Sequence, residues 1–393
     1  MSSQNEILSK AIDIKDELIT IYRQLHMNPE LSFEEYRTSE FIAGYLEKLG
    51  LEVRTGIGKT GVVATLKGMK PGNTIALRAD IDALPIQEEN SSEYKSKAEG
   101  KMHACGHDAH MAILLGAAKL LTENRDKLKG IVKFIFQPAE EIVSGAELMI
   151  KEGVLENPRV DEALALHVFP DTRSGHVKIK SGPAMASVDD FEITITGCGG
   201  HGSNPQGAVD PIMIGAQIIN TLYTVLGRKT RFQDPAVVSV CKFHAGTKSN
   251  IIPDKAYMEG TIRCFSEEAK AFVCGQIESV VGGICGINGA NFDIKLIKGV
   301  PVLINNHELV NKFIKVSEDI LQEDQLEVIN KPYMVSEDFS LFAQKIPSVM
   351  FFLGIRNDEK ECIYPLHNPK FTMDEDALCT GTALFVNYCL NNC

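Results

Sequence analysis

Five side chains able to bind a metal ion fall within nine consecutive residues. The segment MHACGHDAH (102–110) contains His103, Cys105, His107, Asp108 and His110. Thiolate and imidazole are good ligands for first-row metals, and a Cys-x-His pair in a turn can direct two donors at one cation. A helix would separate that pair, because residues two apart do not share a helix face. The segment therefore favours metal binding by Cys105 and His107, and a polar loop with structural histidines is the alternative.

Two adjacent carboxylates could supply a base and a further ligand. Glu140 and Glu141 closely follow the apolar run IVKFIFQ (131–137), which is typical of a strand buried on both faces. Adjacent side chains diverge, so one carboxylate can bind a metal while its neighbour reaches a water molecule beside it. A Glu pair is more often a solvated turn. Here we expect the strand to place both at the sheet end that carries the Cys/His turn.

Two single histidines would complete the donor set. His167 lies near the end of the apolar segment EALALHV (162–168), and His367 lies in YPLHNPKF near the C-terminus. A lone histidine at a strand end is more often structural than a ligand. Together with the residues above, however, they give five protein ligands, enough for two metals if one donor or a water bridges them. The predicted ligands are Cys105, His107, Glu141, His167 and His367.

The elements that must position these residues alternate between helices and strands. The alternation predicts an α/β core with a mixed, mostly parallel sheet flanked by helices and a site beyond the strand carboxyl ends. Apolar periodicity indicates helices up to residue 28, at about 34–50, from 108, at 307–322 and from 374, and strands at 62–68, 73–80, 130–137, 162–168 and 349–355.

The pattern changes between residues 185 and 299. Alternating strands such as DFEITIT and AYMEGTIRCF are interspersed with helices near 208–226 and 266–284. This texture predicts a separate α+β domain inserted into the first. Residues 1–184 and 300–393 would then form one metal-binding catalytic domain.

Composition excludes several other classes of protein. The chain has 393 residues, 44% of them hydrophobic and 23% charged, as expected of a soluble protein with two domains. With 40 Lys and Arg against 52 Asp and Glu, the net charge of −12 opposes a nucleic-acid partner. The N-terminus lacks an export leader and no window approaches about 18 consecutive apolar residues, so we expect a cytoplasmic protein without a membrane partner. No two cysteines have C-x-x-C spacing, and the nine besides Cys105 are expected to be small buried apolar side chains.

Eight motifs occur in order along the chain. They are MHACGHDAH, FQPAEE, ALHVFP, GGHGSNPQ, SNIIPD, GTIR, SEDF and LHNP. With these motifs the chain resembles the metallo-amidohydrolase branch of the aminoacylase and zinc-carboxypeptidase-like superfamily, which includes hippurate hydrolase, auxin-conjugate hydrolases and N-acetyldiaminopimelate deacetylase. The peptidase branches have a bridging carboxylate where this chain has Cys105, which favours the amidohydrolase branch. The resemblance spans nearly the whole chain and implies that the inserted domain is a lid and the surface of a homodimer.

The resemblance also implies residue roles. The five ligands predicted above keep that role, and Glu140 is the general base. His201 in GGHGS would stabilise the oxyanion, often in the site of the neighbouring subunit, and Asn250 and Arg263 would hold the carboxylate or carbonyl of the substrate. An ordinary surface role is the alternative for Arg263. Asp80 and Asp82 in LRADIDALP are expected to support the ligands or the fold.

The expected activity is hydrolysis of the amide bond of N-acyl amino acids, such as acetyl, benzoyl or indoleacetyl conjugates, to a carboxylate and a free amino acid. It would use two divalent ions, zinc or manganese, with cobalt or nickel as further possibilities. A metal-dependent dipeptidase or carboxypeptidase, a thiol hydrolase with Cys105 as nucleophile and His107 as base, and a non-catalytic binding protein remain alternatives. A dinucleotide site at Gly197, Gly199 and Gly202 is disfavoured because residues 203–207 separate the glycines from any helix.

Overall fold

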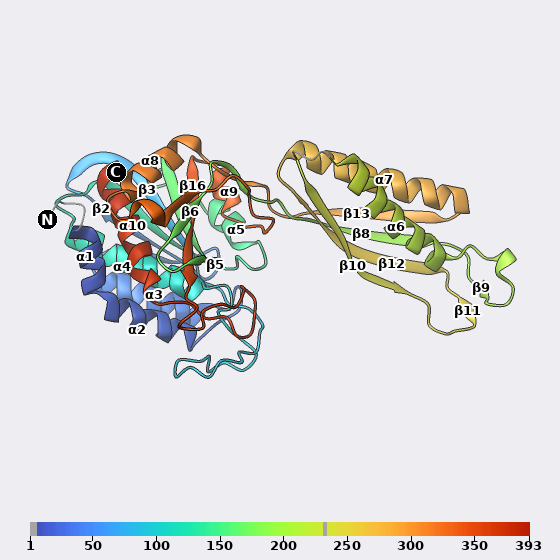
Figure 1. The fold of residues 1–393 in the computed structure, drawn as a ribbon, viewed down its shortest axis with the longest axis horizontal. Coiled ribbons are helices and arrows are strands. Elements are labelled where there is room, and N and C mark those ends of the chain that lie inside the picture. The colour runs from blue at the N-terminus through green and yellow to red at the C-terminus, as the bar shows by residue number, and fades with distance from the viewer. Residues whose placement is uncertain (1–5, 231–233) are drawn as a thin grey trace. The chain divides into compact units, whose positions relative to one another are not determined.

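The computed structural model describes residues 6–230 and 234–393, which form two compact units (Figure 1). The first unit contains the chain up to Ala184, Ile304–Lys331 and Asp338–Cys393, and the second contains Met185–Leu303 and Pro332–Glu337. The sequence pattern assigned Pro332–Glu337 to the first domain. The segment clusters with the second unit because the backbone N–H of Ala186 donates to the carbonyls of Tyr333 and Val335.

A mixed sheet forms the middle of the first unit. Within the described residues it has eight strands, and its four central neighbours, β4, β3, β5 and β16, run parallel to one another. The two strands at one edge, β1 and β2, run antiparallel, as does β6 against β16. The mixed, mostly parallel α/β sheet predicted from the sequence is therefore confirmed. In sheet order the strands are β1 (Glu52–Ile57), β2 (Gly61–Lys67), β4 (Lys129–Gln137), β3 (Lys70–Asp80), β5 (Glu162–Arg173), β16 (Ser348–Arg356), β6 (Val177–Ile179) and β15 (Leu326–Val328).

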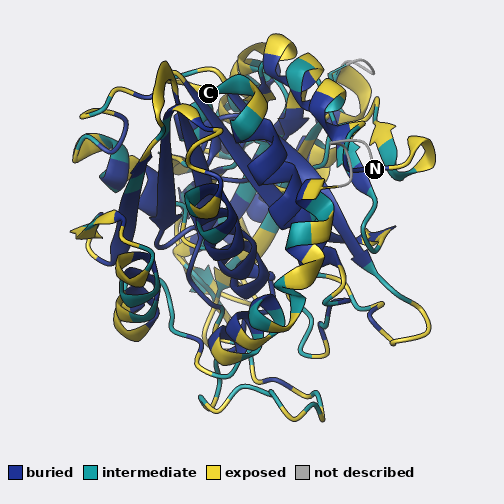
Figure 2. Cartoon of the chain, turned by 90° about the vertical axis from the view of Figure 1, so that its left-hand side faces the viewer, coloured by how far each residue is buried: buried dark blue, intermediate teal, exposed yellow. Residues whose placement is uncertain are grey.

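Helices cover this sheet, and Figure 2 shows the buried strands between them. The most enclosed helix is α4, which contacts α2, α10 and strand β3 and is buried on nearly every side. Gly116 permits this close packing, because a Cβ there would lie 2.4 Å from Leu18 Cδ2. The helices are α1 (Glu6–Asp13), α2 (Lys15–His26), α3 (Tyr36–Lys48), α4 (His107–Glu123), α5 (Gly145–Lys151), α8 (His307–Ser317), α9 (Ser340–Ala343) and α10 (Ala377–Asn392).

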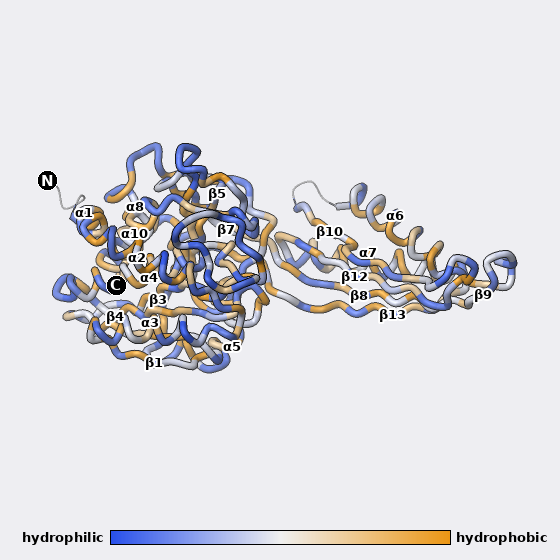
Figure 3. Tube along the Cα trace, turned by 90° about the horizontal axis from the view of Figure 1, so that it is seen from below, coloured by the Kyte–Doolittle hydropathy of each residue, from blue (hydrophilic) through white to orange (hydrophobic). Residues whose placement is uncertain are grey.

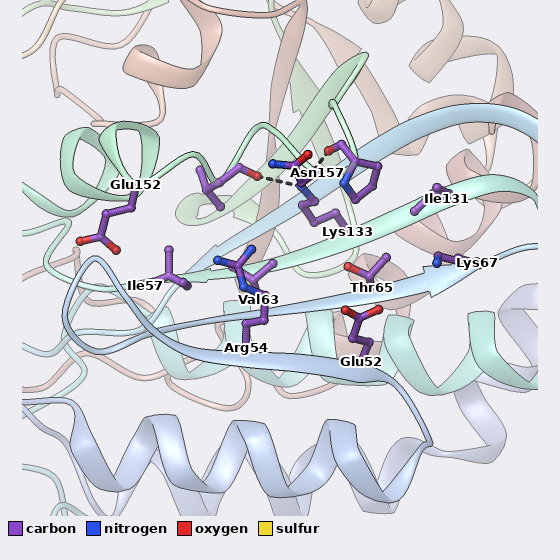
Figure 4. Close-up of a pocket in the computed structure, with 12 residues that line it drawn as sticks. Glu52, Arg54, Ile57, Val63, Thr65, Lys67, Ile131, Lys133, Glu152 and Asn157 are labelled. Carbon is purple, nitrogen blue, oxygen red and sulfur yellow. Dashed lines mark hydrogen bonds between the residues drawn. The ribbon is translucent and has the colours of Figure 1, made fainter.

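One charged residue interrupts the apolar run of β4. Lys133 is only 2% exposed, yet its ammonium donates to the carbonyl oxygens of Val154, Glu156 and Pro158, each at 2.9 Å. Figure 4 shows Lys133 beside the loop that contains Asn157. Three acceptors satisfy all three donors of a lysine, so this burial is tolerated. The side chain thereby fixes the loop after α5 against the sheet, beside a pocket lined by β1, β2 and β4.

The second unit is an α+β structure with its own core. Helices α6 (Pro211–Lys229) and α7 (Glu267–Asn288) contact each other and the antiparallel sheet, and both carry long hydrophobic stretches (Figure 3). By length and composition alone, α7 could cross a membrane; one face of it packs in the core of the unit. The sheet order is β10 (Ala236–Ala245), β12 (Lys255–Cys264), β8 (Asp189–Thr196) and β13 (Asn291–Lys298), and a two-stranded sheet joins β9 (Gly200–His201) to β11 (Ile251–Ile252). A further two-stranded sheet joins β7 (Gly182–Met185) to β14 (Leu303–Asn305), and the residues of these two strands belong to the first unit except Met185 and Leu303.

The cysteines are less uniformly buried than expected. All ten are free, but Cys198 and Cys241 are exposed, and Cys274 and Cys393 are half-buried. The expectation of a buried apolar role was wrong for Cys198 and Cys241, whereas Cys274 and Cys393 pack against the hydrophobic cores.

Candidate metal centre

The five predicted ligands and Glu140 come together in the first unit. Cys105 lies just before α4 and His107 is its first residue, so the turn that opens this buried helix fixes both. Glu140 and Glu141 follow β4, His167 lies on β5, and His367 lies in the segment between β16 and α10. Because strands β4 and β5 are parallel to β3 between them, their carboxyl ends lie on the same side of the sheet, as the sequence pattern suggested.

Cys105 lies at the centre of this cluster. Its Sγ is 3.6 Å from His167 Nε2 and 3.3 Å from His367 Nε2. It belongs to two groups whose donor atoms all lie within 4.8 Å of one another, one with His107 and His167 and one with Glu141 and His367. A further group joins His107 to Glu140 and Glu141. Two groups of donor atoms that have Cys105 in common therefore lie close enough together to offer ligands to two cations.

Two buried atoms in the cluster are placed to bind a cation. Within the described part of the chain, His107 Nε2 and Glu141 Oε1 have no hydrogen-bond partner, and they lie 3.8 Å apart. A buried polar atom without a partner costs about 1–3 kcal/mol. A cation contacting both atoms would remove that cost, so the residues present fit a metal ion.

Hydrogen bonds orient two of the imidazoles for the same purpose. His107 Nδ1 lies 2.9 Å from the carbonyl oxygen of Asp82, and His167 Nδ1 lies 2.8 Å from that of Val168. A carbonyl only accepts, so each Nδ1 carries a proton and donates it. In the neutral form that would bind a metal, each ring keeps a free lone pair on Nε2, the atom that faces the cluster, which is the usual arrangement of a histidine ligand.

The electrostatic field also favours positive charge here. Burial opposes protonation of His107, but the Asp80, Asp82 and Glu141 carboxylates outweigh it and raise its pKa to about 10. Burial raises the pKa of Glu141 to about 7, and burial together with the Glu141 and Glu140 carboxylates raises the pKa of the Cys105 thiol. The same carboxylates that would hold a proton on His107 would hold a metal ion there.

Asp82 organises the turn that carries the two glutamates. Its carboxylate accepts the backbone N–H groups of Glu140 and Glu141, each at 3.1 Å, and the Ser32 hydroxyl at 2.6 Å. The turn is strained, because Ala139 has a φ of +53°. The buried Glu35 carboxylate accepts the Ala139 N–H at 2.9 Å and holds this conformation. The supporting role expected for Asp82 agrees with these contacts, whereas the role of Glu35 was missed.

The remaining predicted residues lie in the second unit, and the structure separates them into two places. His201 pairs with Ile251 across β9 and β11, and Asn250 O accepts the Gly202 N–H, so His201 and Asn250 are neighbours. Both are exposed. Figure 1 shows this small sheet beyond one end of β12.

Arg263 lies near the other end of β12. Eight residue steps from Lys255, at about 3.4 Å each, separate it from the end near His201 by about 27 Å. Its Nη1 donates to Ser336 Oγ at 2.8 Å and to the Met334 carbonyl at 3.4 Å. One small substrate therefore cannot contact Arg263 and His201 of the same chain.

Comparison with known proteins decides the family. Residues 76–391 match the sequence model of peptidase family M20/M25/M40. The chain belongs to this family. It is 46% identical over 373 residues to thermostable carboxypeptidase 2 of Saccharolobus solfataricus, an alignment that covers 94% of this chain and 93% of the relative. It is 42% identical to an N-acetylcysteine deacetylase of Bacillus subtilis over 94% of each chain.

The solved structure of a relative supports a site for two metal ions. The Bacillus subtilis YXEP protein, described as a dinuclear metal-binding peptidase of the M20 family, is 38% identical and superimposes with a TM-score of 0.84 over 96% of this chain and 98% of its own. This member of the M20 family is accordingly a hydrolase that acts on amides. The dinuclear relative and the two donor groups around Cys105 support two metal ions. The suspected resemblance to the aminoacylase-like amidohydrolases is confirmed at the level of this family.

Proposed function

We propose that this protein hydrolyses the amide bond of N-acyl amino acids and releases a carboxylate and a free amino acid. The observation that carries the proposal is the pair of donor groups that share Cys105 beside Glu140. Cys105, His107, Glu141, His167 and His367 would hold two divalent ions. We favour zinc or manganese, with cobalt or nickel as alternatives, because imidazole, thiolate and carboxylate together suit late first-row metals.

The bound ions would polarise the amide carbonyl and make a water molecule nucleophilic near neutral pH. Glu140 would take the proton from that water and deliver it to the leaving amine. The hydrogen bonds that the backbone N–H groups of Glu140 and Glu141 donate to the Asp82 carboxylate orient the backbone of the glutamate pair, so the two side chains keep divergent directions. The Asp82 carboxylate would thus hold both Glu141, the proposed ligand, and Glu140, the proposed base, in place.

The inserted domain would supply the rest of the site. His201 would donate to the developing oxyanion, and Arg263 and Asn250 would hold the carboxylate or carbonyl of the substrate. Since His201 and Arg263 of one chain are too far apart for one substrate, we propose that His201 and Asn250 act in the site of a second copy. A homodimer through the inserted domain would serve this, and exposed apolar residues such as Tyr223 and Phe292 are available for it.

Peptides are the second candidate substrate class, because a relative 46% identical is named a carboxypeptidase. The C-terminal residue of a peptide and an N-acyl amino acid share an amide next to a free α-carboxylate. A thiol hydrolase is disfavoured, because Cys105 is buried and its thiol pKa is raised, whereas a nucleophilic cysteine needs a lowered one.

The test is release of free amine from N-acetyl, N-benzoyl and indoleacetyl amino acids and from dipeptides, in EDTA and after zinc or manganese is restored. Hydrolysis of the conjugates that disappears in EDTA and returns with metal is expected. Exclusive cleavage of dipeptides would replace the proposed substrate class. Activity that survives EDTA but is lost with iodoacetamide would instead show a thiol mechanism.

A further inference from the structure

His110 lies between two of the proposed ligands without being one of them. Its ring centroid is 5.4 Å from that of His107, with the rings nearly parallel, and 4.7 Å from that of His167, edge to face. The side chain is 1% exposed. By distance alone, Asp80, His107 and His110 form another group that could hold a cation.

The hydrogen bonds of His110 exclude that role. The backbone N–H of Val168 lies 3.0 Å from His110 Nε2, and a backbone amide can only donate, so Nε2 accepts with its lone pair. The proton of the neutral ring must then be on Nδ1, which lies 2.6 Å from Asp80 Oδ1. Both ring nitrogens are occupied, and neither is available to a metal.

The bond to Val168 replaces a missing sheet contact. The ladder between β3 and β5 ends where Arg78 pairs with Ala165, so Val168 has no partner on β3. His110 supplies the acceptor there instead and holds β5 directly after His167. At its other nitrogen it is tied to Asp80, which is fixed by Arg78 Nη1 at 2.8 Å. A chain of three hydrogen bonds thus runs from Arg78 to the backbone beside His167.

We propose that His110 is a positioning residue that, as a neutral imidazole protonated on Nδ1, sets the spacing between His107 and His167. The inference rests on the proposed function, since it takes these two histidines as metal ligands. His110 adds no charge beside the cations and leaves Asp80, His107 and His167 in fixed positions. Its loss should weaken metal binding while the fold persists.

The first test is the protonation pattern of the ring nitrogens by NMR on histidine-labelled, metal-free protein in chelator. The His110 signal, identified by its absence in His110→Asn, should show protonated Nδ1 and unprotonated Nε2. Addition of zinc should shift the ring nitrogens of His107 and His167 and leave the His110 pattern in place. A proton on Nε2, or a zinc-induced shift of His110 like that of the ligands, would overturn the proposal.

The second test separates the two hydrogen bonds. His110→Asn keeps a donor near Asp80 and loses the acceptor for Val168, whereas His110→Gln keeps an acceptor and loses the donor. Because loss of a residue that orients a ligand typically costs 10- to 100-fold in metal affinity, each variant should bind zinc about 10- to 100-fold more weakly in a chelator competition. His244→Asn, at an exposed histidine on β10, is the control and should bind like the wild type.

The outcomes separate a failure of the positioning role of His110 from a failure of the proposed function. Variants that give the wild-type circular dichroism spectrum and zinc affinity would refute the positioning role and leave the proposed function intact. Wild-type protein that binds no metal would refute the proposed function, while the tautomer measured in the metal-free protein still decides how His110 is bonded. If the variants do not fold, the His110 signal is assigned in the wild type through its hydrogen bond with the Val168 amide, and its protonation pattern decides.

Discussion

The contacts of Asp82 allow the effect of one substitution to be worked out. Its two carboxylate oxygens accept the N–H groups of Glu140 and Glu141 and the hydroxyl of Ser32. In Asp82→Asn one oxygen becomes an NH₂ group, which cannot accept and must face at least one of these donors. At least one hydrogen bond to a charged group is lost, worth about 1.5–3 kcal/mol. If the loss appears in the transition state, kcat/KM falls about 10- to 150-fold.

The assay compares kcat/KM for an N-acyl amino acid with the urea-unfolding free energy of the metal-free protein. Asp82→Asn should lose activity by that factor and up to about 3 kcal/mol of stability. Ser32→Ala is the matched control, because it removes a donor to the same carboxylate without touching either glutamate, and it should stay within about threefold of wild-type kcat/KM. A folded Asp82→Asn enzyme with more than half the wild-type kcat/KM would refute the idea that this carboxylate positions the glutamate pair.

Three further outcomes are expected. His201→Ala should lower kcat by roughly 100- to 1000-fold, because one donor to an oxyanion is typically worth about 2.7–4 kcal/mol; a loss under tenfold would remove His201 from the mechanism. Arg263→Lys should raise KM for the N-acyl amino acid, because lysine cannot grip a carboxylate with two parallel bonds, and an unchanged KM would leave Arg263 only its bonds to the 334–336 segment. Burial opposes charge on His26, but Asp108 and Glu88 outweigh it and raise its pKa from 6.5 to about 9. The charged His26 thereby stabilises the fold by about 3 kcal/mol below pH 6.5, and this stabilisation is lost as the pH rises through 9. The urea-unfolding free energy of the wild type should therefore fall between pH 6.5 and 9, and that of His26→Gln should fall much less. Equal dependence of the unfolding free energy on pH in the two proteins would contradict this prediction.

The sequence predicted which candidate ligands come together better than it predicted the contacts that support them. Cys105 and His107 are close in sequence and open a helix, and Glu140 follows a strand whose apolar run is unmistakable, so periodicity alone could place them. Asp82 and Glu140 are 58 residues apart, and no local pattern indicates that a carboxylate on one strand end accepts the amides after another. His110 was counted among the metal-binding residue types, yet only the bond to Val168 shows that its ring is already occupied.

The structure of short or irregular segments also could not be predicted from the periodicity of the sequence. Strands β6 and β15 have three residues each, too few for a period to show. Pro332–Glu337 has no apolar periodicity, and its place in the second unit depends on bonds from Ala186 and Arg263, far away in the sequence. The buried Lys133 in an apolar strand is explained only by three carbonyls that converge on it.

The central claim is that this chain would hold two metal ions with Cys105 among their ligands, and metal stoichiometry tests it most directly. Metal-free protein titrated with cobalt should bind two ions per chain and develop a thiolate-to-cobalt absorption band. Cys105→Ser should lose the band and bind both ions with lower affinity, because Cys105 belongs to both donor groups. Binding of a single ion, or a thiolate band that persists in Cys105→Ser, would contradict the account.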